Sequence, residues 1–222
     1  MVFGSCAAAQ GLFSMDTTED GHMWEGVGRL EISGQAFCTG ALIEPALVLT
    51  AAHCLFDPAT GLPVPEDEIQ FLAGWRHGRA AAYRRVRTAV VHPDYDYTNP
   101  SETDRVRNDL ALIRLQHPIR NTTIDPFATD TQPKTGARVA VVSYAHNRSE
   151  APSLQELCQV LSRQEGMLIL SCEVDFGASG SPVFSFDDAG TPRIVSVVSA
   201  KAQANGQPVS LATTLNGPLD SL

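Results

Sequence analysis

Short runs rich in Val, Ile, Leu and Phe recur along this chain between turn residues, and this spacing constrains the fold more than any other feature. None of the runs extends into a sustained helical period. The predicted strands are Val27–Ile32, Ala41–Thr50, Ile69–Ala73, Tyr83–Val91, Leu110–Leu115, Ala137–Ser143, Cys158–Ser162, Met167–Val174, Pro182–Phe186, Ile194–Ala200 and Val209–Thr214. Short strands at such intervals are typical of an all-β barrel or sandwich.

The segment Gln116–Lys134 divides these strands into two comparable sets. Its part up to Gln132 contains Pro118 and Pro126 and shows little periodicity, which is typical of a linker between domains. We therefore expect a first β domain at residues 22–118 and a second at 119–222. Residues 1–21 are expected to be an N-terminal remnant or pro-segment. Ala7–Ala9 read like the end of a secretory signal peptide without its basic region, although an ordinary flexible terminus is the alternative.

Composition excludes several classes of partner. The 222 residues are 43% hydrophobic, enough for a sizeable core, and carry a formal net charge of -9. This acidic balance argues against nucleic acid or an acidic membrane surface as the main partner. No stretch approaches the ~18 consecutive apolar residues of a membrane span.

The stretch "LTAAHC" places His53 beside Cys54 at the end of an apolar run. His53 could be a catalytic base, a metal ligand or a core histidine. A metal site lacks further ligands at suitable spacing, so no metal is expected. Cys38 and Cys54 flank an apolar strand pair turned at Glu44–Pro45, and a hairpin of that length makes a disulfide between them geometrically reasonable. The remaining histidines, including His146, are interpreted as surface or structural residues.

Two further motifs complete a possible catalytic set. Asp109 opens the apolar run in "RNDLALIRL", where a partly buried carboxylate needs a partner such as an imidazole N–H. Ser179 lies in the small-residue turn "DFGASGSPVF". A serine needs an imidazole to take its proton, and the imidazole needs a carboxylate to fix its tautomer. The N–H groups of Gly177 and Ser179 are natural donors to an oxyanion, so the set is complete for acyl transfer without a cofactor.

The motifs "LTAAHC", "NDLALIRL" and "GASGSPVF", in the order His, Asp, Ser, resemble the trypsin/chymotrypsin-like serine peptidases. The α/β-hydrolases have the opposite order, Ser, acid, His. The resemblance implies two six-stranded antiparallel β-barrels packed perpendicular, with the active site in the cleft between them. It implies His53 as base, Asp109 as orienting acid and Ser179 as nucleophile, with Gly177 and Ser179 forming the oxyanion hole. Ser199 in "SVVSAK" matches the serine of the substrate-binding strand.

The chain also departs from the animal members of that family. Ala178 stands where they have the Asp that pairs with a new N-terminus, so this activating ion pair is not expected. "GASGSPVF" is instead similar to a bacterial branch that includes glutamyl endopeptidases. The segment "CQVLSRQEGMLILSCEVDFGASGSP" resembles the same branch and is interpreted as a hairpin that brings Cys158 and Cys172 together. Two disulfides and a spare Cys6 fit a secreted or periplasmic protein.

Substrate-binding candidates are Glu173, Val198, Ser199 and Lys201. Val198 stands where glutamyl endopeptidases have a histidine, so specificity for glutamate is not carried over. Glu173 lies near the position of the specificity-pocket acid of trypsin-like enzymes, although a solvated loop carboxylate is the commoner case. Lys201 is placed to reach the pocket rim.

Two hypotheses remain. In the first, the protein is a secreted, monomeric serine endopeptidase that acts on peptides or proteins through an acyl-enzyme on Ser179. In the second, it is a catalytically silent double-barrel homologue that binds peptides or proteins in the cleft. The presence of His53, Asp109 and Ser179 together favours the first.

Overall fold

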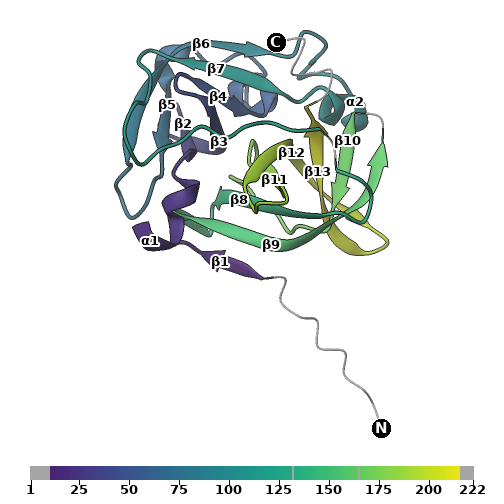
Figure 1. Ribbon diagram of the computed structural model, residues 1–222. Coiled ribbons are helices and arrows are strands. Elements are labelled where there is room, and N and C mark those ends of the chain that lie inside the picture. Colours follow the sequence, from purple (N-terminus) through teal and green to yellow (C-terminus); the bar gives the residue numbers. More distant parts are fainter. Residues whose placement is uncertain (1–10, 132, 165, 216–222) are drawn as a thin grey trace.

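Two closed, six-stranded antiparallel barrels make up the computed structural model, which describes residues 11–131, 133–164 and 166–215 (Figure 1). The first barrel contains β2 (Val27–Ile32), β3 (Ala36–Glu44), β4 (Leu47–Thr50), β5 (Ile69–Ala73), β6 (Ala82–Val91) and β7 (Ala111–Leu115). The second contains β8 (Arg138–Ala145), β9 (Arg148–Gln164), β10 (Met167–Leu170), β11 (Pro182–Phe186), β12 (Pro192–Ala204) and β13 (Gln207–Thr214). The predicted all-β double-barrel fold is therefore confirmed.

The first barrel closes in the order β2-β3-β4-β7-β6-β5. In the second, the order is β9-β10-β13-β12-β11-β8, and pairing between β8 and β9 closes the ring. The predicted run Ala41–Thr50 contains the expected turn, and β3 and β4 are its two arms. β3 begins earlier than predicted, at Ala36, because a tight turn with positive φ at Ser33 and Gly34 leads into it.

The largest difference from prediction is the length of β9. Only Cys158–Ser162 is predicted as strand, whereas β9 runs from Arg148 to Gln164. Its first half is rich in polar residues, but β8 pairs with it along one edge. On the other edge lie β10 and, further upstream, β1 (Leu12–Ser14). Pairing on both edges overrides a weak local preference for strand.

Short helices were also missed by the sequence analysis. They are α1 (Thr18–Gly21) and α2 (Glu102–Arg107), together with 3-10 turns η1 (His22–Trp24), η2 (Ala52–Leu55) and η3 (Glu66–Glu68). The start of α2 does carry a signal, since the Ser101 side chain accepts a hydrogen bond from the Asp104 N–H. In the part of the chain that the structure describes, no helix has the length and apolar character to cross a membrane.

The N-terminal segment contacts both barrels. β1 pairs with residues 153–155 of β9, and the Met15 N–H donates to the Pro152 carbonyl at 2.9 Å. The buried Arg76, between β5 and β6, donates from Nε to the Met15 carbonyl at 2.9 Å. The predicted domain boundaries at residues 21 and 118 remain predictions.

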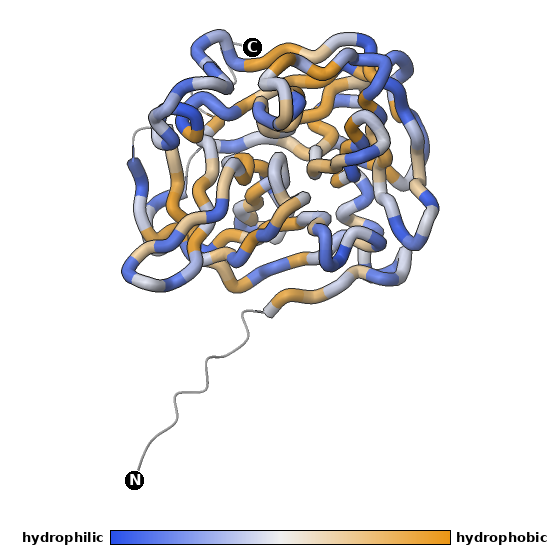
Figure 2. Tube along the Cα trace, turned by 180° about the vertical axis from the view of Figure 1, so that it is seen from behind, coloured by the Kyte–Doolittle hydropathy of each residue, from blue (hydrophilic) through white to orange (hydrophobic). Residues whose placement is uncertain are grey.

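The cores lie inside the barrels and between them. Figure 2 shows long apolar stretches along the trace, whereas many outer loops are hydrophilic. Trp24, Phe127 and Phe184 form an aromatic cluster, with ring centroids 4.9 Å apart for Trp24 and Phe184 and 4.8 Å for Phe127 and Phe184. Since Phe127 belongs to the segment that connects the barrels and Phe184 to β11, this cluster fixes the connection to the second barrel.

Candidate active site

His53 lies in η2, directly after β4, and is held there by a disulfide. Cys38 of β3 and Cys54 of η2 are bonded, with their Cα atoms 6.2 Å apart. Both cysteines are buried. The bond ties the turn that carries His53 to the neighbouring strand, as expected from the hairpin.

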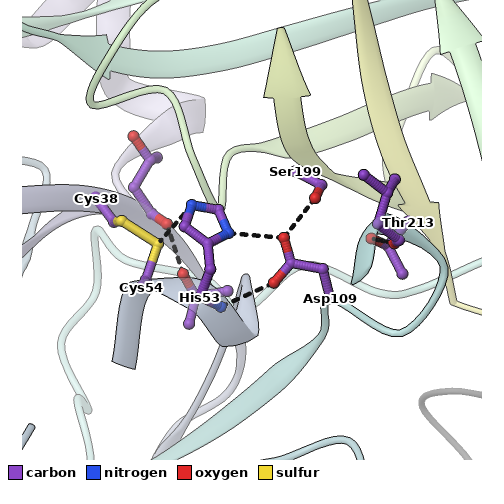
Figure 3. A network of polar contacts seen from close by, with 9 residues as sticks. Cys38, His53, Cys54, Asp109, Ser199 and Thr213 are labelled. Atoms are coloured by element: carbon purple, nitrogen blue, oxygen red, sulfur yellow. Dashed lines mark hydrogen bonds and ion pairs between the residues drawn. A yellow bond between two sulfur atoms is a disulfide. The ribbon is translucent and has the colours of Figure 1, made fainter. Parts of the chain in front are cut away.

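Asp109 lies between α2 and β7 and is 2% exposed. Its Oδ1 accepts the backbone N–H of His53 at 2.8 Å, and its Oδ2 accepts the Nδ1–H of the same residue at 2.7 Å. The Ser199 hydroxyl also donates to Oδ2 (Figure 3). These donors offset the cost of burying a carboxylate. They also favour the tautomer in which Nδ1 carries the proton and Nε2 is the free base.

The pKa of His53 reflects two opposing effects. Burial lowers it, whereas the negative charge of Asp109 and the hydrogen bond to it raise it. The result is a pKa above the usual value for histidine. The Nε2 atom lies 3.9 Å from the Cys54 sulfur, on the side of the ring away from Asp109 (Figure 3).

Ser179 lies in the loop of residues 175–181 that precedes β11, which we call the 175–181 loop. Gly177 and Gly180 have positive φ angles of 94° and 78°, so the loop turns where only glycine is unstrained. The Ala178 N–H donates to the Asp175 carbonyl at 2.9 Å, and the Ser181 N–H donates to the Ala178 carbonyl at 3.1 Å. Within the described residues, the N–H groups of Gly177 and Ser179 donate no hydrogen bond.

A cleft of about 890 Å³ brings most of the predicted site residues together. Those that line it are His53, Gly177, Ser179, Val198, Ser199 and Lys201. Asp109 lies behind His53. Glu173 is exposed and does not line the cleft, and its N–H donates to Gln155 Oε1 at 3.1 Å. Among the described contacts, no hydrogen bond joins the Ser179 hydroxyl to His53.

Lys201 connects two walls of the cleft. Its Nζ lies 3.2 Å from Asp175 Oδ1 and 3.9 Å from the centre of the Phe176 ring. The pKa of Asp175 is lowered, first by the N–H of Phe176 and then by the hydrogen bond to Lys201. The charge of Lys201 thus has a partner within the protein.

Sequence reasoning missed an aromatic row along the cleft. Phe37 stacks on His146 with 5.1 Å between ring centroids, and His146 meets the edge of Phe176 at 6.4 Å. His146 is exposed, in agreement with its interpretation as a surface residue, but it also lines the cleft. No sequence signal links these rings, because each belongs to a different segment of the chain.

The residues around His53 also bear on whether His53 could be a metal ligand. Cys38, His53 and Cys54 place potential ligand atoms within 4.8 Å of one another. Both cysteines are consumed by their disulfide, so neither offers a thiolate, which is the form that binds metal.

Cys158 of β9 and Cys172 form a second disulfide, with Cα atoms 5.1 Å apart. Cys172 lies just before the 175–181 loop, so this bond anchors the loop to β9. Cys6 lies outside the described residues.

The two barrels, with a histidine held by a buried aspartate in the cleft, define a protein of the chymotrypsin-like, serine-protease type. The sequence model of the Trypsin family matches residues 16–217. The chain therefore belongs to the trypsin family.

Similar proteins agree with this assignment. Coagulation factor XII of Rattus norvegicus is 39% identical over 83 residues, which are 37% of this chain and 13% of that protein. Mannan-binding lectin serine protease 1 of Mus musculus is 33% identical over 126 residues, 50% of this chain and 17% of that protein. This chain thus spans only a small part of the length of these relatives.

The solved structure of a Glu endopeptidase in complex with MPD superposes with a TM-score of 0.77. The match covers 96% of this chain and 95% of that chain at 18% sequence identity, and it concerns the fold. The predicted bacterial character stays a prediction, because the relatives named above are animal proteins.

Proposed function

We propose that the protein is a serine endopeptidase that forms an acyl-enzyme on Ser179. The observation that carries this proposal is the buried Asp109, which holds the Nδ1–H of His53 at 2.7 Å while His53 and Ser179 line one cleft. This is the arrangement of base, orienting acid and nucleophile that acyl transfer needs.

The proposed reaction begins when Ser179 Oγ attacks the carbonyl carbon of the scissile peptide bond. His53 Nε2 takes the hydroxyl proton, and the imidazolium that forms is stabilised by Asp109. The N–H groups of Gly177 and Ser179, which have no partner in the described part of the chain, donate to the oxyanion. One such donor is worth about 3–4 kcal/mol in the transition state.

Breakdown of the tetrahedral intermediate cleaves the C–N bond, and His53 gives its proton to the leaving amine. A water molecule then attacks the acyl-enzyme, with His53 acting again as base, and releases the acid and free Ser179. Ser199 supports these steps indirectly, because its hydroxyl donates to the Asp109 carboxylate that orients His53.

We further propose that Val198, Ser199 and Lys201 bind the residue that precedes the cleaved bond and that the pocket prefers an apolar side chain. Apolar side chains at Val174, Phe176 and Val198 line this part of the cleft. Lys201 and Asp175 already pair with each other, so an anionic substrate side chain would have to displace Asp175, and a cationic one would have to displace Lys201. Glu173 is not included, because it does not line the cleft.

Cleavage profiling with a peptide library tests this preference. We expect cleavage after apolar residues in the wild type. Strong selection for Glu, Lys or Arg at that position would contradict the proposed pocket, and a change of selection in Lys201→Ala would identify Lys201 as the residue responsible.

The main proposal is tested by labelling with a fluorophosphonate, which phosphonylates an activated serine. The wild type should be labelled at one site per molecule, and Ser179→Ala should not be labelled. Ser185→Ala is the matched control, since Ser185 lies in β11 and does not line the cleft. Absence of labelling in a folded wild-type protein would refute the proposal.

One observation favours the silent homologue as a second candidate. No hydrogen bond joins Ser179 Oγ to His53 among the described contacts, so the nucleophile is not yet activated in this geometry. Such bonds are often long before substrate binds. The labelling experiment separates the two candidates, because a silent homologue would bind peptides, by calorimetry, without being labelled.

We also propose that the protein is monomeric and that it is secreted or periplasmic. The two disulfides support an oxidising compartment. Peptide mapping without reductant should recover both linked pairs from the protein isolated from its native compartment, and free thiols at either pair would contradict this assignment. Sedimentation equilibrium tests the monomer.

A further inference from the structure

Thr39 occupies an open strand edge against which the 175–181 loop packs. β4 pairs with β3 only from Ala41 onwards, so the preceding part of β3 has no strand on that side. The Thr39 N–H, which points outward there, donates to the Ser179 carbonyl at 2.8 Å. Thr39 is completely buried.

The Thr39 hydroxyl joins this loop to the second barrel. Its Oγ1 donates to the Gly177 carbonyl at 3.0 Å and accepts the N–H of Tyr144, in β8, at 3.1 Å. The Thr39 carbonyl in turn accepts the Thr50 hydroxyl at 2.9 Å. Thr39 is therefore fixed from several directions, and it can hold the loop without moving itself.

Three consecutive peptide groups of the loop are held by their carbonyls. The Phe176 carbonyl accepts the His146 N–H at 2.8 Å, and the Ala178 carbonyl accepts the Ser181 N–H at 3.1 Å. The Gly177 carbonyl between them accepts the Thr39 hydroxyl. In a trans peptide the N–H points away from the carbonyl. The two outer bonds thus direct the N–H groups of Gly177 and Ser179, and the Thr39 bond fixes the peptide group that links them.

This support matters because the residue directly before Ser179 in the loop is not a carboxylate. Ala178 is buried and apolar, so no ion pair from that position can organise the loop. Gly177 tolerates a wide range of backbone angles, so the loop needs an external partner to hold one of them.

We propose that Thr39 is a positioning residue, whose hydroxyl keeps the Gly177 and Ser179 N–H groups directed at the oxyanion. This inference rests on the proposed peptidase function. It assigns to a residue of the first barrel the task of shaping a loop of the second. Thr39 does not contact the substrate and acts through the Gly177 carbonyl.

The test compares Thr39→Val, which keeps the shape but removes the hydroxyl, with Thr39→Ser, which keeps the hydroxyl. We expect Thr39→Val to lower kcat on a peptide amide by about 10- to 100-fold. A misplaced group in an active site, or a lost oxyanion donor, lowers kcat by about 100-fold. KM should change by less than about threefold, since the hole acts in the transition state. Thr39→Ser should recover most of kcat.

Labelling by the fluorophosphonate gives an independent readout, because its phosphoryl oxygen uses the same donors. Its second-order rate should fall in Thr39→Val by the same factor as kcat. Ser196→Ala is the matched control, since the buried Ser196 hydroxyl donates to the Thr213 carbonyl at 2.6 Å and does not line the cleft. The control should lose thermal stability but keep kcat.

Each other outcome overturns the inference. A folded Thr39→Val with wild-type kcat shows that the hydroxyl does not position the loop. A lower fraction of active molecules with an unchanged rate per active site shows a structural role only. If Thr39→Val does not fold, the smaller Thr39→Ala takes its place, and wild-type kcat in that variant is equally decisive. A wild type with neither labelling nor turnover overturns the proposed function as well, whereas an active wild type with an unaffected Thr39→Val overturns this inference alone.

Discussion

Replacement of Asp109 by asparagine should remove most of the activity while leaving the protein folded. In the native site, one carboxylate oxygen accepts the His53 backbone N–H and the other accepts both Nδ1–H and the Ser199 hydroxyl. An asparagine side chain has only one oxygen for these positions. With that oxygen on the backbone N–H, its NH₂ group faces Nδ1, which must then lose its proton. The imidazole is forced into the tautomer with the proton on Nε2, where it cannot act as base.

The size of the effect follows from this change of tautomer. A comparable substitution in a serine protease triad lowers kcat by about 10⁴-fold, which is about 5 kcal/mol of transition-state stabilisation. We expect the same order here, because Asp109 is buried and its charge is not replaced by solvent. Removal of Ser179, by comparison, should abolish labelling altogether.

The pH profile gives the sharper test. If His53 is the base, as proposed, wild-type activity requires its neutral form and should fall as the pH drops through the raised pKa of this residue. Without the Asp109 charge, the raising effect is lost and burial remains, which lowers the pKa. The acidic limb of kcat/KM in Asp109→Asn should therefore move to lower pH.

The assay is kcat/KM on a peptide ester from pH 4.5 to 9, with circular dichroism to establish that each variant is folded. Ser199→Ala is an informative companion, since it removes one donor to Asp109 and keeps the charge. It should lower activity far less than Asp109→Asn. An acidic limb that stays in place or moves to higher pH in Asp109→Asn would refute the assignment of Asp109 as the charge that sets the pKa of His53.

Three other predictions concern stability, and each is measured by urea unfolding. A Cβ at Gly177 would lie 2.4 Å from the Phe37 ring, so Gly177→Ala should lower the free energy of unfolding. Gly190→Ala is the control, because Gly190 has a similar positive φ and a Cβ there would meet no atom within 4 Å. The loss should be larger at Gly177, and equal losses would contradict the clash. Removing the Cys38–Cys54 disulfide with a double alanine variant should cost about 3 kcal/mol for a loop of this length, and a loss below 1 kcal/mol would contradict it. The pKa of His53 in the folded protein is raised above 6.5, so the contribution of His53 to the free energy of unfolding is complete below that pH and is lost as the pH rises through the folded pKa. The difference in this free energy between wild type and His53→Ala should therefore be larger at pH 5 than at pH 9. A difference that does not change with pH would be the contrary result.

The strands and the three proposed catalytic side chains could be predicted from the sequence because each leaves a local signal. Alternating or continuous apolar runs mark β2, β5 and β11, whose bounds were predicted as observed. His53, Asp109 and Ser179 stand in short motifs with a recognisable order. The first half of β9 leaves no such signal, because its polar residues become strand only through pairing with β8 and β1.

The same reasoning explains why the supports of the site were missed. Thr39 is an ordinary strand residue in sequence, and its importance comes from contacts to Gly177 and Tyr144, which lie far along the chain. Glu173, in contrast, was predicted to bind substrate only because its distance along the chain from Ser179 resembles that of the specificity-pocket acid in trypsin-like enzymes. Its exposed position outside the cleft depends on how the loop leaves Cys172, which spacing alone does not determine.

Two hydrogen bonds of the candidate site cross from one barrel to the other. The first barrel supplies Asp109 and His53, but Ser199 of the second barrel donates to Asp109. The second barrel supplies Ser179, but Thr39 of the first barrel donates to its carbonyl. Each barrel thus completes hydrogen bonds of the other's proposed catalytic residues. Because buried polar groups are costly when left without partners, the geometry required for catalysis is stable only when the barrels are docked.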